Sequence, residues 1–268
     1  MQRPIESLGE RSIVEAHAPD DFDALPHVRL VEFRYVKSDS FDVSLGAIRP
    51  APATSRSLPS YAHHPDLVVS LDDPAFRVLY VTAEAAPLAK VGGLGDVARA
   101  LPPALREVGV GCDVALPLYR QVRESGRAVR LRRDVPPYEA FGATGTFAEL
   151  IVEETGTRVW LVECDRYFDR NHPYVDESGR GFADSLERFV FFQRAVLHLA
   201  SVLRERDEVR YDLLHANDHQ TALLPAYVRN TEVGKRLGNP PTVLTIHNLG
   251  YQGVYPESAH QIVSPDEV

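Results

Sequence analysis

Cysteine is scarce in this chain of 268 residues, which holds two, Cys112 and Cys164. Two cysteines cannot build the disulfide framework of a small secreted protein, and neither stands in a CxxC or Cys/His spacing typical of a zinc site. Apolar runs stay well short of the roughly 18 residues that a membrane-spanning helix needs. The N-terminus lacks an apolar signal core and is acidic, unlike an Arg-rich transit peptide. A cytoplasmic protein is the default expectation.

An excess of basic residues is also missing. Lys and Arg number 29 against 38 Asp and Glu, which gives a formal charge of −9. This balance argues against a nucleic-acid or anionic-membrane partner, because nothing offsets the repulsion from phosphate groups. Any bound anion must be held locally by a few cations and backbone amides. With 44% hydrophobic and 25% charged residues, the chain suits one large α/β domain with an appendage.

The composition changes near residue 75. Before it, a strand-like stretch (28–36) is followed by a segment rich in proline and small polar residues (47–66), which is typical of a linker. We assign no function to this N-terminal extension, residues 1–75. From residue 76 to 268 strands alternate with helices, which predicts an α/β domain with a Rossmann-like, doubly wound and mostly parallel sheet.

The elements of this domain can be read from hydrophobic periodicity. Strands are expected at 76–82, 112–117, 146–153, 157–164, 211–215 and 242–246, and helices at 96–108, 184–206 and 221–229. The third and fourth strands form a hairpin around Thr155-Gly156. The first helix carries four apolar residues on one face, namely Val97, Leu101, Leu105 and Val108. Its Pro102 and Pro103 should kink it.

Three polar clusters each follow a predicted strand: KVGGLGDV (90–97), HANDHQ (215–220) and HNLGYQG (247–253). In doubly wound sheets, ligands bind beyond the carboxyl ends of the strands. We therefore expect the three clusters to lie along one rim of the sheet. A Gly-x-Ser-x-Gly elbow and a paired-carboxylate spacing, which would indicate a hydrolase, are missing from the sequence.

The first cluster joins a strand to a helix and admits two interpretations. It can be a tight turn, or Gly92, Gly93 and Gly95 can let a phosphate approach backbone amides at a helix N-terminus. Lys90 would add a full positive charge. The spacing is neither GxGxxG nor GxxxxGK[ST], so a standard dinucleotide site or P-loop is not expected.

The other two clusters are rich in hydrogen-bonding groups. In the second, Asp218 is a candidate N-cap for the following helix and a candidate ligand of a sugar hydroxyl, whereas metal binding is disfavoured by the close spacing. The third offers His247, Asn248, Tyr251 and Gln252, donors and acceptors that suit a polyhydroxylated ligand.

Taken together, the motifs resemble the N-terminal half of bacterial glycogen synthase and plant starch synthase. The resemblance covers about residues 76–257, begins with VLYVTAEAAP before the glycine cluster, and includes a weaker element, HPYVD (172–176). Members of this family are retaining glycosyltransferases of the GT-B type, with two Rossmann-like domains. The resemblance implies transfer of glucose from ADP-glucose to the nonreducing end of an α-1,4-glucan (glycogen or starch), without a metal or other cofactor.

The resemblance also implies roles for individual residues. Four belong to the donor: Lys90 at the phosphate, Gly92 and Gly93 giving backbone access, and Asp96 in the same cleft. Two are catalytic: His247, which contacts the transferred glucose, and Asp218, which lies near the acceptor glucan. Acceptor or sugar contacts are assigned to Tyr174, Asn248, Tyr251, Gln252 and Glu84.

The chain departs from the family pattern in three ways. His219 and Gln220 follow Asp218, where the family has an aromatic residue and then a histidine. Pro103 is an unusual second proline. The chain also ends at Val268, before the second domain that supplies further diphosphate and sugar contacts. The resemblance therefore predicts that these residues alone do not turn over, and that they are a fragment or the partner of a separately encoded C-terminal half.

Two other functions stay open on the sequence. One is a non-catalytic module that binds glucan or a protein partner, because polar rims of this kind bind sugars without chemistry. The other is a related transferase that uses UDP-glucose, since the nucleotide contacts of the family come largely from the second domain.

Overall fold

An eight-stranded sheet forms the centre of the structure, a computed structural model that describes residue 74 and residues 76–264. Its strand order is β3-β5-β6-β2-β1-β7-β8, and β4 pairs with β5. The strands are β1 (Phe76–Val81), β2 (Val110–Pro117), β3 (Arg130–Leu131), β4 (Tyr138–Ala140), β5 (Ala143–Val152), β6 (Thr157–Glu163), β7 (Leu213–Asn217) and β8 (Thr242–Thr245). The predicted extension, except for Pro74, lies outside the described residues, so its boundary stays a prediction.

The sheet is parallel from β6 to β8 and antiparallel at the other edge. β1 pairs in parallel with both β2 and β7, β2 with β6, and β7 with β8. The predicted hairpin is confirmed, because β5 and β6 pair antiparallel with Val152 opposite Thr157. β1 and β2 are buried over most of their lengths, as expected of central strands covered on both faces. The doubly wound, mostly parallel prediction is confirmed.

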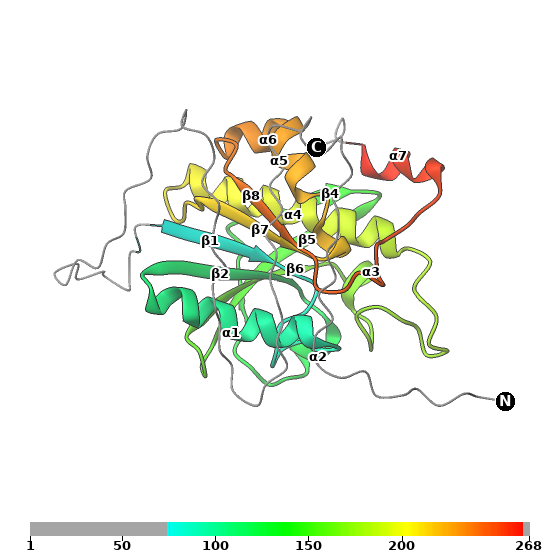
Figure 1. Ribbon diagram of the computed structural model, residues 1–268, viewed down its shortest axis with the longest axis horizontal. Coiled ribbons are helices and arrows are strands. Elements are labelled where there is room, and N and C mark those ends of the chain that lie inside the picture. The colour runs from blue at the N-terminus through cyan, green and yellow to red at the C-terminus, as the bar shows by residue number, and fades with distance from the viewer. Residues whose placement is uncertain (1–73, 75, 265–268) are drawn as a thin grey trace, which may run out of the picture. The chain divides into compact units, whose positions relative to one another are not determined.

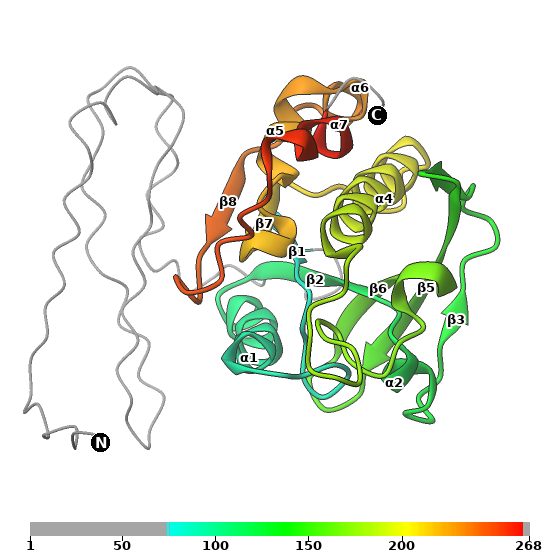
Figure 2. The same ribbon diagram turned by 90° about the vertical axis from the view of Figure 1, so that its right-hand side faces the viewer.

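Helices cover both faces of the sheet. They are α1 (Gly93–Glu107), α2 (Arg120–Arg123), α3 (Asp165–Phe168), α4 (Ser185–Glu205), α5 (Leu224–Asn230), α6 (Glu232–Arg236) and α7 (His260–Val263). Figures 1 and 2 show α1 on one side of the sheet and α4 and α5 on the other. In the described part of the chain, α4 and its shorter companions are too short or too polar to span a bilayer.

The long helix α4 carries much of the core. Phe191 contacts Tyr138 of β4 edge-on, with ring centroids 5.3 Å apart, and His198 stacks on Phe147 of β5 at 5.8 Å. The predicted helix 184–206 is therefore confirmed almost to the residue. Through these two contacts α4 covers the antiparallel edge of the sheet.

The predicted helices differ from the structure in three details. α1 begins at Gly93, three residues before the expected start, so two of the cluster's glycines lie in its first turn. Val108 is 73% exposed, because the helix ends at Glu107 and Gly109, with φ 80°, turns the chain into β2. The predicted helix 221–229 is divided in the structure. His219–Thr221 form a short 3-10 turn, and α5 begins at Leu224, so that its proline lies in the first turn, where proline is favoured.

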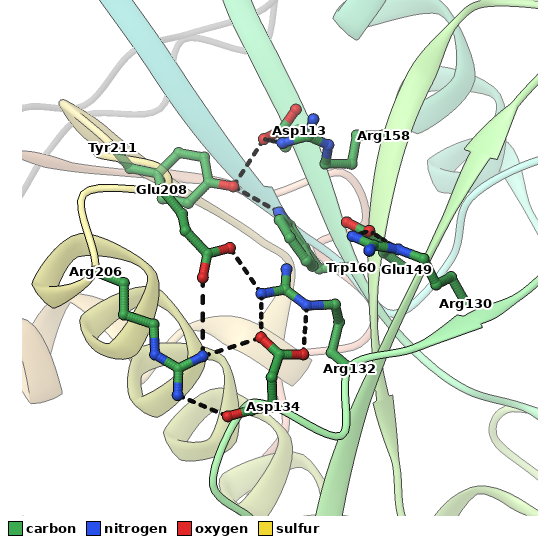
Figure 3. A network of polar contacts seen from close by, with 10 residues as sticks. All are labelled: Asp113, Arg130, Arg132, Asp134, Glu149, Arg158, Trp160, Arg206, Glu208 and Tyr211. Carbon is green, nitrogen blue, oxygen red and sulfur yellow. Dashed lines mark hydrogen bonds and ion pairs between the residues drawn. The ribbon is translucent and has the colours of Figure 1, made fainter.

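At the end of α4, a polar network joins the helix to the antiparallel edge (Figure 3). The buried Arg132 donates to both carboxylate oxygens of Asp134, at 3.0 and 2.7 Å, and to Glu208 at 2.7 Å. Arg206 donates to Asp134 as well, at 3.0 Å. The buried guanidinium group of Arg132 donates to two carboxylates at once, so the network ties the loop after β3 to the residues that follow α4.

A second chain of hydrogen bonds runs through the interior beside it (Figure 3). Trp160 Nε1 donates to the Tyr211 hydroxyl at 2.6 Å, and Tyr211 donates to Asp113 Oδ2 at 2.8 Å. Burial raises the pKa of Asp113, and the hydrogen bond from Tyr211 and the nearby Arg158 and Arg77 oppose that shift. Asp113 is thus a buried carboxyl whose charge is only partly compensated.

Candidate functional site

The three polar clusters follow adjacent strands and meet at their carboxyl ends. β1, β7 and β8 are neighbours, with Val81 paired to Ala216 and Asn217 paired to Thr245. The loops that leave these strands therefore start side by side, as the sequence predicted. The rim they form is the candidate functional site.

Glu84, just beyond β1, organises the glycine cluster. The residue is 4% exposed, and its Oε2 accepts from the backbone amides of Val91 and Gly92, both at 2.7 Å. The sequence suggested a sugar contact for Glu84 and free backbone access at Gly92. In the structure the Glu84 carboxylate accepts the hydrogen bond of the Gly92 amide, so this amide is not free for a ligand.

Tyr174 approaches the same carboxylate from the HPYVD segment. Its hydroxyl donates to Glu84 Oε1 at 2.7 Å, across a separation of 90 residues in the sequence. Burial, followed by the nearby Tyr119 and Glu84, raises the pKa of Tyr174, so its proton stays in this bond. His172 Nδ1 accepts from the Tyr174 amide at 3.0 Å, and Arg188 donates to the Pro173 carbonyl.

Lys90 and Asp96 form an ion pair on the outer side of the loop. Their Nζ and Oδ1 atoms are 2.7 Å apart, and both side chains are about half exposed. Such a pair contributes little stability, so the ammonium can exchange Asp96 for a stronger anion. Gly95 permits the arrangement, because a Cβ there would lie 3.0 Å from Lys90 Cγ.

Asp218 bridges the ends of β7 and β8. Its Oδ1 accepts from the backbone amides of His247, at 2.6 Å, and Asn248, at 3.3 Å. It makes no side-chain cap on the following turn, so the capping interpretation of this aspartate was wrong. With φ 57° and ψ −178°, its backbone lies in a region that is otherwise essentially restricted to glycine. A strained, half-buried carboxylate at a rim is typical of a functional position.

His247 is held by a residue to which the sequence assigned no role. Asn217 donates through Nδ2 to the carbonyls of Val81 and His215, at 3.1 and 3.0 Å, which leaves Oδ1 to accept from His247 Nε2 at 2.9 Å. Burial lowers the pKa of His247, and the carboxylates of Asp218 and Glu84 oppose that shift. The ring is therefore neutral at pH 7, with its proton on Nε2. The one feature of the sequence that pointed to this role of Asn217 was its position directly before Asp218.

The remaining histidines of the second cluster have structural surroundings. His215 contacts Thr245 Oγ1 at 2.7 Å, and burial, with the nearby His247, lowers its pKa to about 4. The ring of His219 lies under Gly253, where a Cβ would meet it at 2.7 Å and where φ is 63°. Among the described residues, no three His, Cys, Asp or Glu side chains are grouped to hold a metal ion.

The third cluster's tip folds on itself. Asn248 Oδ1 accepts from the Gly250 amide, and Gln252 Nε2 donates to the Leu249 carbonyl, both at 2.9 Å. Tyr251 is 71% exposed. These three predicted sugar contacts are thus separate from the network that joins Glu84, Tyr174 and the loop of Lys90.

Comparison with known proteins places residues 77–267 in the family described as the starch synthase catalytic domain. The chain is 38% identical to the glycogen synthase of Rhodospirillum rubrum over 184 residues, and 39% identical to that of Granulibacter bethesdensis over 194 residues. These matches cover 67% and 71% of the chain, but only 36% and 38% of the two relatives.

A solved structure matches over the same region. It is the catalytic domain of starch synthase IV from Arabidopsis thaliana, bound to ADP and acarbose, with a TM-score of 0.55 and 29% identity. The match covers 68% of the chain and 35% of that structure. The chain therefore spans a little over a third of the proteins it resembles.

Proposed function

Since the chain belongs to the starch synthase catalytic-domain family of glycosyltransferases, we propose that it forms the N-terminal part of a retaining glucosyltransferase. The donor is ADP-glucose, and the acceptor is the nonreducing end of an α-1,4-glucan. The observation that supports this most is the meeting of three family motifs at the ends of β1, β7 and β8. The binding of ADP and acarbose by the Arabidopsis relative agrees with such substrates.

On the donor side, Lys90 binds the diphosphate. Its ion pair with Asp96 is exposed and weak, whereas an ammonium on a phosphate makes charge-assisted hydrogen bonds. Backbone access is proposed at Gly93, where a Cβ would have nothing within 4 Å, and at Gly92 if the loop shifts. Asp96 then lines the same donor site.

On the sugar side, His247 contacts the transferred glucose and its carbonyl faces the positive charge that develops on the sugar. A neutral ring suits this role, because a second cation there would oppose the oxocarbenium-like charge. Asp218 keeps His247 in place by accepting a hydrogen bond from the His247 backbone amide, and its other carboxylate oxygen faces the acceptor glucan. Tyr174, which is half-buried, offers a ring face to the glucan.

In our proposal the chain by itself does not catalyse glucose transfer. The glycine cluster brings a single lysine to the diphosphate, and a water-excluding closure between two domains is typical of two-domain transferases. Several apolar side chains are exposed along β8 and after it: Leu244, Ile246, Leu249, Tyr251 and Val254. We name them the β8 patch and propose that the rest of the catalytic unit covers it, from the same chain or from a separate one.

Ligand titration tests the proposal. ADP-glucose, UDP-glucose and maltoheptaose are each titrated against the chain by NMR, and Lys90→Ala is compared with Lys235→Ala. Lys235 also pairs with a nearby carboxylate, Glu232 at 2.5 Å, but lies on α6. We expect Lys90→Ala alone to weaken ADP-glucose binding about 10- to 100-fold, the scale of a hydrogen bond to a charged group.

Other outcomes have distinct meanings. Binding of maltoheptaose without either nucleotide sugar would favour a glucan-binding module, and tighter binding of UDP-glucose would change the donor. Incorporation of labelled glucose into glycogen by the chain alone would disprove the proposed inactivity.

A further inference from the structure

We propose that Glu84 is a positioning residue that couples the glucan side of the site to the donor loop. Its carboxylate is the shared partner of two segments that the sequence keeps far apart, the loop at Val91 and Gly92 and the HPYVD segment at Tyr174. The inference rests on the proposed function for the identity of the two ligands, but its structural part does not depend on them.

The bonds of Glu84 divide cleanly between its two oxygens. Oε2 accepts both loop amides at 2.7 Å, and Oε1 accepts the Tyr174 hydroxyl at 2.7 Å. The backbone amide of Glu84 donates to Thr82 Oγ1 at 3.2 Å, and the Thr82 hydroxyl donates to the Glu84 carbonyl at 2.9 Å. The backbone of Glu84 is thereby fixed to the end of β1, so a displacement at one oxygen is felt at the other.

The Tyr174 end is also firmly supported. Arg188, whose side chain is fully buried, donates to the carbonyl of Pro173, and His172 accepts from the amides of Tyr174 and Val175 at 3.0 and 3.2 Å. Tyr174 itself stays half-buried, and its ring lies beside those of His172 and Phe189, with centroids 6.0 and 6.4 Å away. A firmly supported tyrosine that is not fully buried is the arrangement expected of a residue that a ligand can reach.

The loop end, in contrast, is exposed. Val91, Gly92 and Gly93 are all open to solvent, and a Cβ at Gly92 or Gly93 would meet nothing within 4 Å. Glu84 holds the first two through their backbone amides, whereas Gly93 is the first residue of α1. A glucan that packs on Tyr174 restrains the Tyr174 hydroxyl, Glu84 and the loop together. A donor that binds afterwards then loses less conformational entropy in ordering the loop.

Hydrogen exchange measures the structural part without any ligand. We expect Tyr174→Phe to speed exchange of the Val91 and Gly92 amides at least about fivefold, with unchanged exchange in β1. Tyr227→Phe is the matched control, because it removes one hydroxyl that donates to the Val263 carbonyl at 3.1 Å. Unchanged exchange at Val91 and Gly92 in a folded Tyr174→Phe chain would overturn the coupling.

Glu84→Gln gives a second, independent variant. Its single oxygen can accept the loop amides while its NH2 group donates to the Tyr174 oxygen, so we expect it to keep the slow exchange that Glu84→Ala loses. Equal exchange in Gln and Ala variants, both faster than wild type, would mean that the negative charge and not the link orders the loop, contrary to the proposal.

The ligand part is measured by linkage. ADP-glucose is titrated into the chain with and without saturating maltoheptaose, and we expect it to bind about fivefold more tightly with the glucan present, the lower end of common coupling effects. In Tyr174→Phe the two affinities should be equal. ADP-glucose binding without any effect of maltoheptaose on wild type would overturn the coupling. Absence of ADP-glucose binding would overturn the proposed donor site at Lys90 and the glycine cluster, while the exchange experiment still decides the role of Glu84.

Discussion

The Asp218 carboxylate accepts a hydrogen bond of 2.6 Å from the backbone amide of His247. In return, the Asp218 amide donates to the Thr245 carbonyl at 2.8 Å, so the ends of β7 and β8 are joined in both directions. The imidazole of His247 is therefore placed by the turn in which it sits and by Asn217 on the other side. Asp218 has a structural task in addition to its proposed contact with the acceptor.

Replacing Asp218 separates these two tasks. Asp218→Asn keeps an acceptor oxygen and a side chain of the same shape, so it adds no new backbone strain, and we expect a free energy of unfolding close to wild type. Asp218→Ala loses the acceptor and should lower it by about 1–3 kcal/mol. Urea unfolding followed by fluorescence of Trp160, the one tryptophan of the chain, measures both. An Asn variant as unstable as the Ala variant would show that the charge is what holds the turn.

Gly92 tests whether a ligand approaches the loop backbone. A Cβ there would have nothing within 4 Å, so Gly92→Ala should leave the free energy of unfolding within about 0.5 kcal/mol of wild type. We expect the same variant to weaken ADP-glucose binding about tenfold, because the methyl group would stand in the way of a phosphate once the loop shifts and the Gly92 amide leaves Glu84. Gly181→Ala, whose Cβ also meets nothing within 4 Å, is the control. Unchanged ADP-glucose affinity in Gly92→Ala would place the phosphate elsewhere.

Asp113 predicts an unusual dependence of stability on pH. Burial raises its pKa, so its ionisation costs the folded state more than the unfolded state as the pH rises. Asp113→Asn keeps an acceptor for Tyr211 and removes that cost. We expect it to raise the free energy of unfolding at pH 7 by about 1 kcal/mol, a common scale for single substitutions, with a smaller gain at pH 4.

Asp134, in the same region, serves as the control because its pKa is shifted in the opposite direction to that of Asp113 (Figure 3). Hydrogen bonds from Arg132 lower its pKa, so its stabilising effect is present at neutral pH and is lost as the pH falls. Asp134→Asn should therefore destabilise the protein at pH 7 and do so less at pH 3. If both Asn variants changed stability in the same direction at pH 7, the assignment of the Asp113 pKa shift would be wrong.

The β8 patch predicts self-association of the isolated chain. Leu249 and Val254 are 73% and 86% exposed, and an apolar surface of this kind favours contact with another surface. We expect the double variant Leu249→Ser, Val254→Ser to weaken association about tenfold in sedimentation velocity, on the scale of about 1 kcal/mol or more per apolar side chain removed. The double variant Val108→Ser, Ile151→Ser, exposed elsewhere, should not. Equal effects of the two would make the association non-specific.

Periodicity and strand-end composition were enough to predict the class of fold and the rim. Buried strands and the long helix 184–206 each bury apolar residues at a regular spacing, which is a local property of the chain. The meeting of three clusters also followed from the sequence, because parallel strands share one carboxyl edge. The end of α1 at Glu107 was misjudged at Val108, since the apolar period continues one residue past the point where Gly109 turns the chain.

The partners of the polar side chains were decided by the tertiary structure alone. Glu84 meets Tyr174 across 90 residues, and Asp218 meets the His247 amide across 29 residues, and no local pattern encodes either distance. A carboxylate can accept from a helix turn, a neighbouring loop or a ligand with similar energy, so the donor that packing brings nearest determines its role. The sequence by itself therefore determined the sheet and the edge where the site lies. Packing decided that Glu84 holds the donor loop, that Asp218 joins two strands and that Asn217 orients His247.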